Sequence, residues 1–290
     1  MVRYNSTSSS GNLFAVMVAV LAISLFAIIV MWPSSAAKTV VAKVPDTPLT
    51  QALDDRETHR YLAALHRVKP KFAKKLQTQG EEAIASGASK DELAVLVLET
   101  YNTAIEEDIL YLLNADVKHI ERLLEISQQG LSTLSSKAPK YCRPSSYAQF
   151  AIMEPDAIAT EIASLLAYGS GGYNWVLEFN TITLDAIESG RDKPKKYGRL
   201  TSKDQMTLQN TMMSLMSNPQ VARLMQLQGK SEAEQRRAAM SMDFCDLSVD
   251  VLAVVNSMPT ETKARMLGEL QHQAKTGDLG LMMAMLQSGM

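Results

Sequence analysis

The sequence predicts an all-α protein in which one N-terminal transmembrane helix precedes a soluble domain of about 10–12 helices. Three observations lead to this prediction. The run Leu13–Trp32 contains twenty residues and no charge. From Gln51 onward, apolar residues recur mostly at the spacing of helices, and few runs alternate as strands do. Helix-start and helix-stop signals recur along the same stretch.

The composition excludes several classes of protein. The chain has 290 residues, with 29 Lys and Arg against 31 Asp and Glu, and its formal net charge is −2. Proteins dedicated to nucleic acid usually carry a clear basic excess, so we expect no nucleic-acid partner. With 46% hydrophobic and 21% charged residues, the chain is neither a disordered acidic tail nor a polytopic membrane protein.

The N-terminal part divides into three predicted segments. Residues 1–12 form a short polar tail, residues 13–32 the membrane helix, and residues 33–50 a linker with three prolines. A helix over Leu13–Trp32 is about 30 Å long, which matches the hydrocarbon core of a bilayer. Pro33 then ends the helix. The first expected partner is therefore the lipid bilayer, through Leu13 to Trp32.

The apolar segment has a second interpretation. Ser35-Ala36-Ala37 offers the small residues of a signal-peptide cleavage site, with cleavage after Ala37. Signal peptides have apolar cores of about 7–15 residues, shorter than this run, so we favour an uncleaved, single-pass signal anchor. The short polar head favours a domain outside the cytoplasm, which in a bacterium means an inner-membrane anchor and a periplasmic domain. The basic residues around the span are nearly balanced and do not decide the orientation.

The two cysteines, Cys142 and Cys245, both lie in the domain. Outside the cytoplasm we expect them to form a disulfide. Their separation of 103 positions gives such a bridge about 4–5 kcal/mol in the loop-entropy model. The alternative is two buried, unpaired thiols that act as small core residues.

The domain, residues 51–290, is predicted to be a succession of helices. Ser89 and Ser231 each begin a Ser-x-x-Glu capping box, and prolines and glycines stand where helices start and end, Gly190 among them. Residues 136–154 form the longest irregular stretch and a candidate division into two subdomains. Helices are expected over residues 51–68, 70–86, 90–113, 115–135, 155–168, 173–189, 202–217, 219–228, 231–243, 246–257, 259–275 and 278–287.

Two acid-x-x-His pairs, Asp116 with His119 and Glu269 with His272, resemble the pairs of di-iron helical bundles. His272 points away from the apolar stripe of its predicted helix, and Asp116 is equally placed to cap a helix. We therefore expect capping or surface roles for these residues and no cofactor. Gly169-Ser170-Gly171-Gly172 lacks a preceding strand and a Gly-Lys-Ser/Thr sequence, so it does not predict a phosphate site.

Methionine is abundant and unevenly placed, since thirteen of the 17 follow residue 200. Methionine fills cores and adaptable interaction surfaces, and we expect a protein partner or self-association through this Met-rich C-terminal half. Thioethers also bind Cu(I), which makes a metal-handling domain a third hypothesis. The candidate ligands for it are the clustered methionines Met212, Met213, Met216, Met240 and Met242.

Two groups of basic residues are candidate contacts to an anionic partner. The first group is Arg67, Lys69, Lys71, Lys74 and Lys75. The second lies in residues 190–199, and its candidates are Lys193, Lys195, Lys196 and Arg199. The glycine and proline within 190–199 predict a simple solvated loop as the default interpretation.

Ile187-Glu188-Ser189-Gly190 resembles the Glu-Ser pair of lytic transglycosylases, which are all-helical cell-wall enzymes with a single Glu as general acid/base. Leu224-Met225-Gln226-Leu227 resembles a later motif of that family, although Val221-Ala222-Arg223 stands where its glycines are expected. The resemblance covers about eight residues, and it implies glycan cleavage with Glu188 as the catalytic residue. Such a Glu needs a partly apolar cleft that raises its pKa.

The leading hypothesis is a membrane-anchored helical scaffold or assembly protein without catalytic activity. It follows from the apolar span, the Met-rich C-terminal half and the lack of a coherent set of catalytic residue types. The alternative is the cell-wall glycan-cleaving enzyme that uses Glu188. The environment of Glu188 distinguishes the two hypotheses: a buried cleft for the enzyme, an open helix end for the scaffold.

Overall fold

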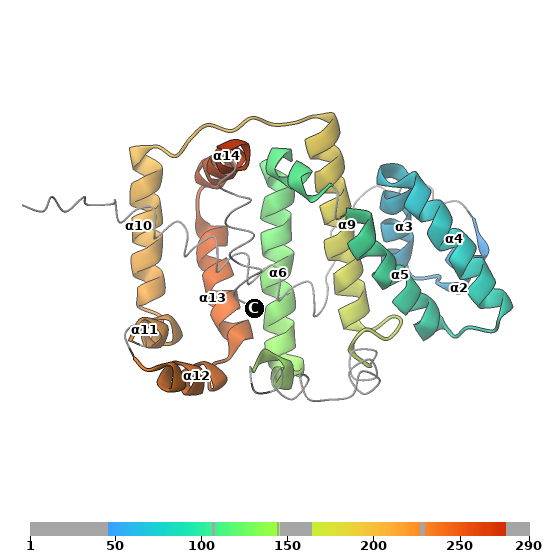
Figure 1. The fold of residues 1–290 in the computed structure, drawn as a ribbon, viewed down its shortest axis with the longest axis horizontal. Helices are drawn as coiled ribbons and strands as arrows, with labels where there is room; N and C mark the ends of the chain where they lie inside the picture. Colours follow the sequence, from blue (N-terminus) through green and yellow to red (C-terminus); the bar gives the residue numbers. More distant parts are fainter. Residues whose placement is uncertain (1–45, 106–107, 144, 146–163, 227–229, 277–290) are drawn as a thin grey trace, which may run out of the picture.

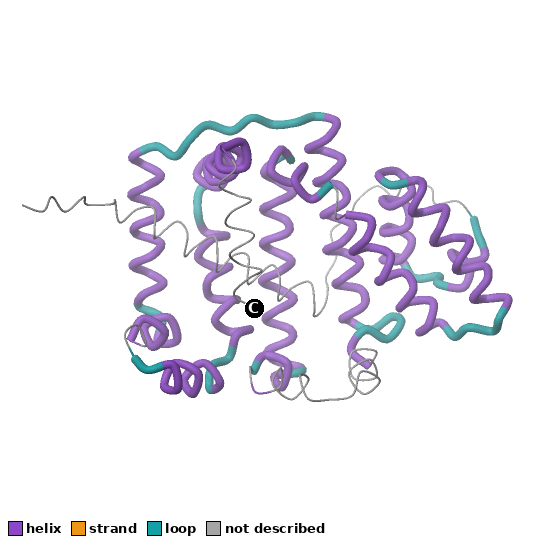
Figure 2. Tube along the Cα trace, in the orientation of Figure 1, coloured by secondary structure: helices purple, strands orange, loops and turns teal. Residues whose placement is uncertain are grey.

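The computed structural model describes residues 46–105, 108–143, 145, 164–226 and 230–276. All the elements in these ranges are helical, and none of the ranges contains a strand, which confirms the predicted all-α class (Figure 2). None of the described helices combines the length and the apolar composition that crossing a bilayer requires. The predicted membrane helix over Leu13–Trp32 lies outside the described residues, as does the predicted helix 278–287 and most of 155–168.

Four helices form the N-terminal part: α2 (Pro48–Ala52), α3 (Arg56–Val68), α4 (Pro70–Ala85) and α5 (Lys90–Ile105). The prediction of one helix over 51–68 was wrong, because α3 has its own start. The Asp55 carboxylate accepts a hydrogen bond from the Thr58 amide at 2.8 Å, and this cap opens α3. The capping box predicted at Ser89 is confirmed, with the Ser89 amide donating to the Glu92 carboxylate at 2.7 Å.

The predicted helix 90–113 was also too long. α5 ends at Ile105, and a separate 3-10 helix, η1 (Ile109–Asn114), follows. Asp116 then caps α6 (Val117–Lys137) by accepting a hydrogen bond from the Lys118 amide at 3.2 Å. The apolar spacing across this region therefore belongs to three successive elements.

The C-terminal part contains η2 (Pro139–Cys142), α9 (Gly171–Asp192), α10 (Ser202–Met216), α11 (Pro219–Gln226), α12 (Glu232–Met240), α13 (Phe244–Ser257) and α14 (Thr260–Thr276). The sequence placed α9 to α14 within a few residues of these bounds. Gly190 lies inside α9, however, and does not end it. A Cβ on Gly190 would lie 1.9 Å from the Tyr111 carbonyl oxygen, so this glycine permits η1 to pack directly on α9.

The helices α10, α13, α6 and α9 stand side by side, and α3, α4 and α5 group beyond α9 (Figure 1). Two apolar cores result. One lies between α2 to α5 and the face of α9 that carries Tyr173, Leu177 and Leu184. The other lies between α6, α10, α13, α14 and the face of α9 that carries Trp175 and Phe179. The helix α9 is thus the shared wall of both cores.

A connecting segment, residues 193–201, joins α9 to α10 across the top of the helices α9, α6, α13 and α10 (Figure 2). We name this segment the strap. The Lys195 amide donates to the Asn114 carbonyl at 2.8 Å, and the Tyr197 hydroxyl donates to the Ala115 carbonyl at 2.7 Å. The side chain of Gln271 on α14 donates to the Lys195 carbonyl at 2.8 Å. Residues 193–199 are an exposed loop, as the default prediction stated, whereas residues 190–192 belong to α9. Hydrogen bonds to η1 and α14 hold the backbone of the strap.

Candidate functional site

Glu188, the candidate catalytic residue, lies near the C-terminal end of α9 and pairs with Arg67 at the end of α3. The Arg67 Nε donates to both carboxylate oxygens of Glu188, at 2.9 and 2.8 Å. Arg67 Nη2 also donates to Asp185, one turn earlier on α9. The three side chains are 29 to 39% exposed. One guanidinium therefore joins two carboxylates across the α3–α9 contact.

Burial and charge pairing act in opposite directions on the pKa values in this group. Burial lowers the pKa of Arg67. The hydrogen bonds from Arg67 to Glu188 and Asp185, and the negative charges of these two residues, outweigh burial and raise the pKa of Arg67. Burial raises the pKa of Asp185, and Arg67 opposes that shift. Burial lowers the pKa of His119 on α6, against the attraction of Asp185. The contacts of Glu188 itself are the two hydrogen bonds from Arg67, which join α3 to α9.

The remainder of the transglycosylase-like pattern also has structural contacts. The Ser189 hydroxyl accepts a hydrogen bond at 3.3 Å from the amide of Asp116, the residue that caps α6. The side chains of Leu224 and Met225, and the whole of Leu227, lie outside the description. The described part of the pattern therefore ties α9 to α3 and to the start of α6.

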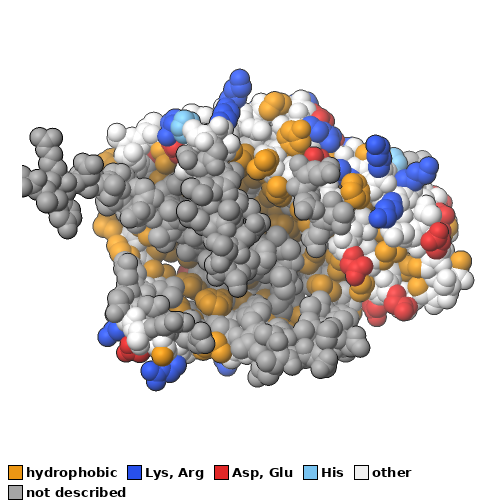
Figure 3. Space-filling view, in the orientation of Figure 1, with side chains coloured by type: hydrophobic (Ala, Val, Ile, Leu, Met, Phe, Trp, Pro, Cys, Tyr) orange, Lys and Arg blue, Asp and Glu red, His pale blue; other side chains and the backbone are white. Residues whose placement is uncertain are grey.

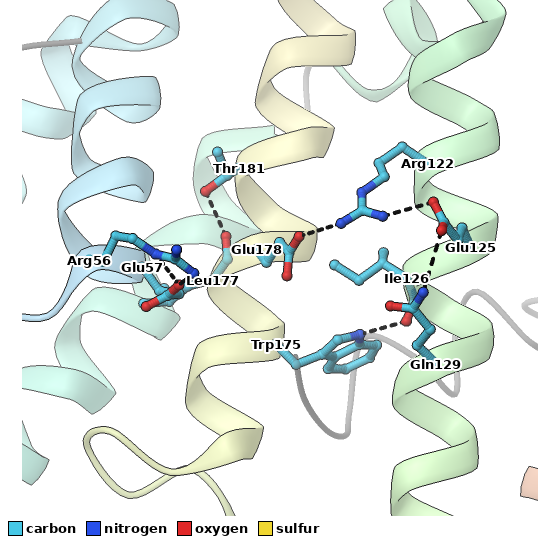
Figure 4. Close-up of polar contacts among 10 residues, drawn as sticks. All are labelled: Arg56, Glu57, Arg122, Glu125, Ile126, Gln129, Trp175, Leu177, Glu178 and Thr181. Carbon is cyan, nitrogen blue, oxygen red and sulfur yellow. Dashed lines mark hydrogen bonds and ion pairs between the residues drawn. The ribbon is translucent and has the colours of Figure 1, made fainter. Parts of the chain in front are cut away.

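Glu178 is a buried acid that was not among the site residues predicted from the sequence. It is 5% exposed on α9, and Arg122 on α6 donates to it at 2.9 Å and to Glu125 at 2.7 Å. Figure 4 shows the guanidinium of Arg122 between the two carboxylates, with the Trp175 indole donating to the Ile126 carbonyl nearby. The signal in the sequence was one acid inside the apolar run Trp175–Phe179, since buried acids need a paired base.

Asp204 is a second such acid, and it joins α10 to α14. It is 1% exposed and accepts hydrogen bonds from Arg265 Nε at 2.6 Å and from the Thr262 hydroxyl at 2.8 Å. These bonds and those from Thr201 lower the pKa of Asp204 against the effect of burial, with Arg265 the largest cause. Asp204 also completes a capping box with Thr201 at the start of α10. Its role is to hold two helices together.

The cysteines are joined as predicted. Cys142 of η2 and Cys245 of α13 form a disulfide with 5.1 Å between their Cα atoms. Asp243 lies close enough to make this trio the one metal-like group in the described ranges. The two sulfurs are bonded to each other and are not thiolates, and Asp243 caps α13 through the Asp246 amide at 3.0 Å. The trio is therefore a disulfide beside a helix cap.

The five candidate methionines differ in their surroundings. Met242 is 2% exposed, and Met212 packs on the second core. Met213, Met216 and Met240 are 57, 40 and 37% exposed. Two of the five methionines therefore fill the core and three lie at the surface. The flexible, apolar side chain of methionine suits both positions.

The glycine-rich stretch before α9 has a structural explanation. Gly169 has a φ of 70°, in the left-handed region that glycine adopts without strain. Ser170 caps α9 by accepting from the Tyr173 amide at 3.1 Å. A Cβ on Gly172 would lie 2.3 Å from the Leu165 carbonyl oxygen, so glycine is required there by close packing.

Comparison with known proteins adds no relative: no family model, no curated protein and no solved structure matches the chain.

Proposed function

We propose that the chain is a membrane-anchored, non-catalytic assembly protein that contacts a second copy of itself through its Met-rich C-terminal half. The observation that supports this proposal is the free face of α10. This helix buries only Asp204, Thr211 and Leu215. Met206 and Met213 on its other face are 59 and 57% exposed. Seven positions separate them, so both lie on one side of the helix.

The composition of this face suits a contact between identical surfaces. Residues 205–222 contain no charged side chain, and the exposed positions beside the methionines are glutamine, asparagine and serine. In a two-fold contact each patch meets its own copy, so a charged patch would repel itself whereas an uncharged one does not. Methionine adapts its shape at such surfaces, and burial of its thioether chain contributes favourable free energy.

The contacts of the acidic residues support a protein without catalytic activity. Glu188 and Asp185 are paired with Arg67, Glu178 with Arg122, and Asp204 with Arg265. Each of these groups links two helices. Each carboxylate is therefore engaged by an arginine in a contact between helices, which is a structural role.

The test is the mass of the full chain in mild detergent, measured by light scattering with the detergent contribution subtracted. We expect a dimer, and we expect the double variant Met206→Glu/Met213→Glu to be a monomer with unchanged helical content by circular dichroism. The matched control is Leu110→Glu, which places a charge on a side chain that is 60% exposed on η1 and leaves the dimer intact. A wild-type monomer, or a dimer that survives the double variant, would contradict the proposal.

A further inference from the structure

The two basic groups of the sequence lie at the same end of the molecule. Six exposed lysines at this end compose what we call the lysine surface, three on the first turns of α4 and three on the strap: Lys71, Lys74, Lys75, Lys193, Lys195 and Lys196.

The folding of α3, α4 and α9 brings the two groups together. The turn at Lys69 joins the end of α3 to the start of α4. Arg191, at the end of α9, donates to the Val68 carbonyl at 3.2 Å, and Arg67 pairs with Glu188 of α9. The start of α4 therefore lies beside the start of the strap. Figure 3 shows several Lys and Arg side chains along this edge of the molecule, with hydrophobic, acidic and other side chains between them.

Acids that the structure describes at this end are already paired with other bases. Asp108 pairs with Lys69 at 2.7 Å, Asp192 with Arg191 at 2.8 Å, and Glu269 with Arg199 at 2.7 Å. Asp185 and Glu188 share Arg67. Within the described part of the chain, none of the six lysines forms an ion pair. Their positive charges therefore add at the surface. The three strap lysines also stand on a backbone that hydrogen bonds to Asn114 and Gln271 hold in place.

The opposite end of the N-terminal part carries more acids than bases, although Lys90 pairs with Asp54 at 2.9 Å. Asp46, Asp54, Asp55, Glu81 and Glu82 lie at the start of α2, at the start of α3 and in the second half of α4. The linker enters the domain at this acidic end, because Pro48 begins α2 and Leu49 packs on Gly80 of α4. An anionic surface would therefore repel this end and attract the lysine surface.

We propose that the lysine surface binds the acidic phospholipid headgroups of the membrane in which the chain is anchored. This inference rests on the anchor of the proposed function. Lysine is a compact charge on a flexible stem, which suits a plane of mobile headgroups better than a ligand of fixed geometry. Linker residues 33–46 span up to about 45 Å when extended, whereas α4 is about 24 Å long. The linker therefore allows the lysine end to reach the bilayer that holds the anchor.

The test is acylation of individual lysines in the full chain, followed by mass spectrometry. The chain is placed in lipid nanodiscs of phosphatidylcholine alone, or with about a third phosphatidylglycerol. We expect the six lysines to react roughly two- to fivefold more slowly in the anionic discs, and 0.5 M salt to remove the difference. Lys137, exposed at the far end of α6, is the internal control and keeps one rate in both lipids.

A variant that removes four of the six charges tests whether the positive charge of the lysine surface causes the lipid dependence. We expect Lys74→Gln/Lys75→Gln/Lys195→Gln/Lys196→Gln to abolish the lipid dependence at Lys71 and Lys193, whereas the control Lys137→Gln leaves it unchanged. Equal rates in the two lipids, or protection that persists in 0.5 M salt, would overturn the inference. A chain that does not enter nanodiscs contradicts the anchor instead. The lysine surface is then tested by sedimentation with phosphatidylglycerol vesicles, and the absence of binding at low salt would overturn it.

Discussion

At the residue scale, the acids of the domain hold helices to each other. Asp204, Glu178 and the pair Asp185 and Glu188 each accept hydrogen bonds from an arginine on another helix. A paired arginine satisfies a buried carboxylate, whereas loss of one partner leaves an uncompensated charge. Stability should therefore depend on the ionisation of Asp204, which is 1% exposed and whose pKa is lowered.

The first prediction concerns Asp204 and pH. Its pKa in the folded protein is lowered from 3.8, with Arg265 the largest cause, so its ionised form stabilises the fold above that value. This contribution is lost as the pH falls below about 4–5. We expect the free energy of unfolding to fall more steeply between pH 5 and pH 3 in the wild type than in Asp204→Asn. The difference has an upper limit of about 1.4 kcal/mol per pH unit, the slope that one proton gives.

Urea unfolding followed by circular dichroism at several pH values measures this difference. At pH 7 the variant should be the less stable protein, because Asn cannot carry the charge that Arg265 and Thr262 stabilise. Asp246→Asn is the control, since that exposed acid lies outside the Asp204 cluster. Parallel pH profiles for the wild type and Asp204→Asn would show that Arg265 does not hold Asp204 ionised.

At the scale of elements, local signals predicted most helices, and tertiary contacts decided the rest. Ser89 with Glu92 and the proline at the start of α11 and α4 predicted helix starts because their physical effect acts within four residues. The break at Asp55 was missed because residues 54–60 contain no apolar residue, proline or glycine, so neither apolar spacing nor a helix-stop residue marks it. The position of Gly190 was misjudged because its role is contact with Tyr111, which lies 79 positions away.

In the candidate site too, the sequence predicted some features, and contacts between distant residues decided the others. Two cysteines allow one pairing, so the sequence alone predicted the bridge between Cys142 and Cys245. Arg67 lies more than 100 positions from Glu188 and Asp185, and no local period indicates which acid a distant arginine meets. The placement of the two basic groups at one end of the molecule was invisible for that reason, since it depends on the contact between α3 and α9.

The second prediction concerns the link between η2 and α13. The disulfide closes a loop of 103 positions, so its removal should cost about 4–5 kcal/mol in the loop-entropy model. We expect the double variant Cys142→Ser/Cys245→Ser to unfold at a much lower urea concentration than the oxidised wild type. The reduced wild type is the matched control and should behave like the variant. A non-reducing gel that shows no mobility shift on reduction would contradict the bridge itself.

At the scale of the whole molecule, α9 contributes side chains to both cores. Tyr173, Leu177 and Leu184 face the first core, and Trp175 and Phe179 face the second. Neighbouring residues of α9 pack in opposite cores. Separation of α9 from the first core would therefore also expose Trp175 of the second core. We therefore expect the described domain to unfold in a single transition.

The third prediction tests this coupling with a change far from its reporter. Leu65 on α3 is fully buried in the first core, and Leu65→Ala should cost about 2–5 kcal/mol through lost burial and a cavity. In a Trp32→Phe background, Trp175 is the only tryptophan and reports on the second core. We expect its fluorescence transition in urea to shift with the circular dichroism transition, by the same free energy. The control Leu110→Ala removes a side chain that is 60% exposed and should shift neither. If Leu65→Ala split the dichroism transition and left the Trp175 transition in place, the two cores would be independent units, and α9 would belong energetically to the second alone.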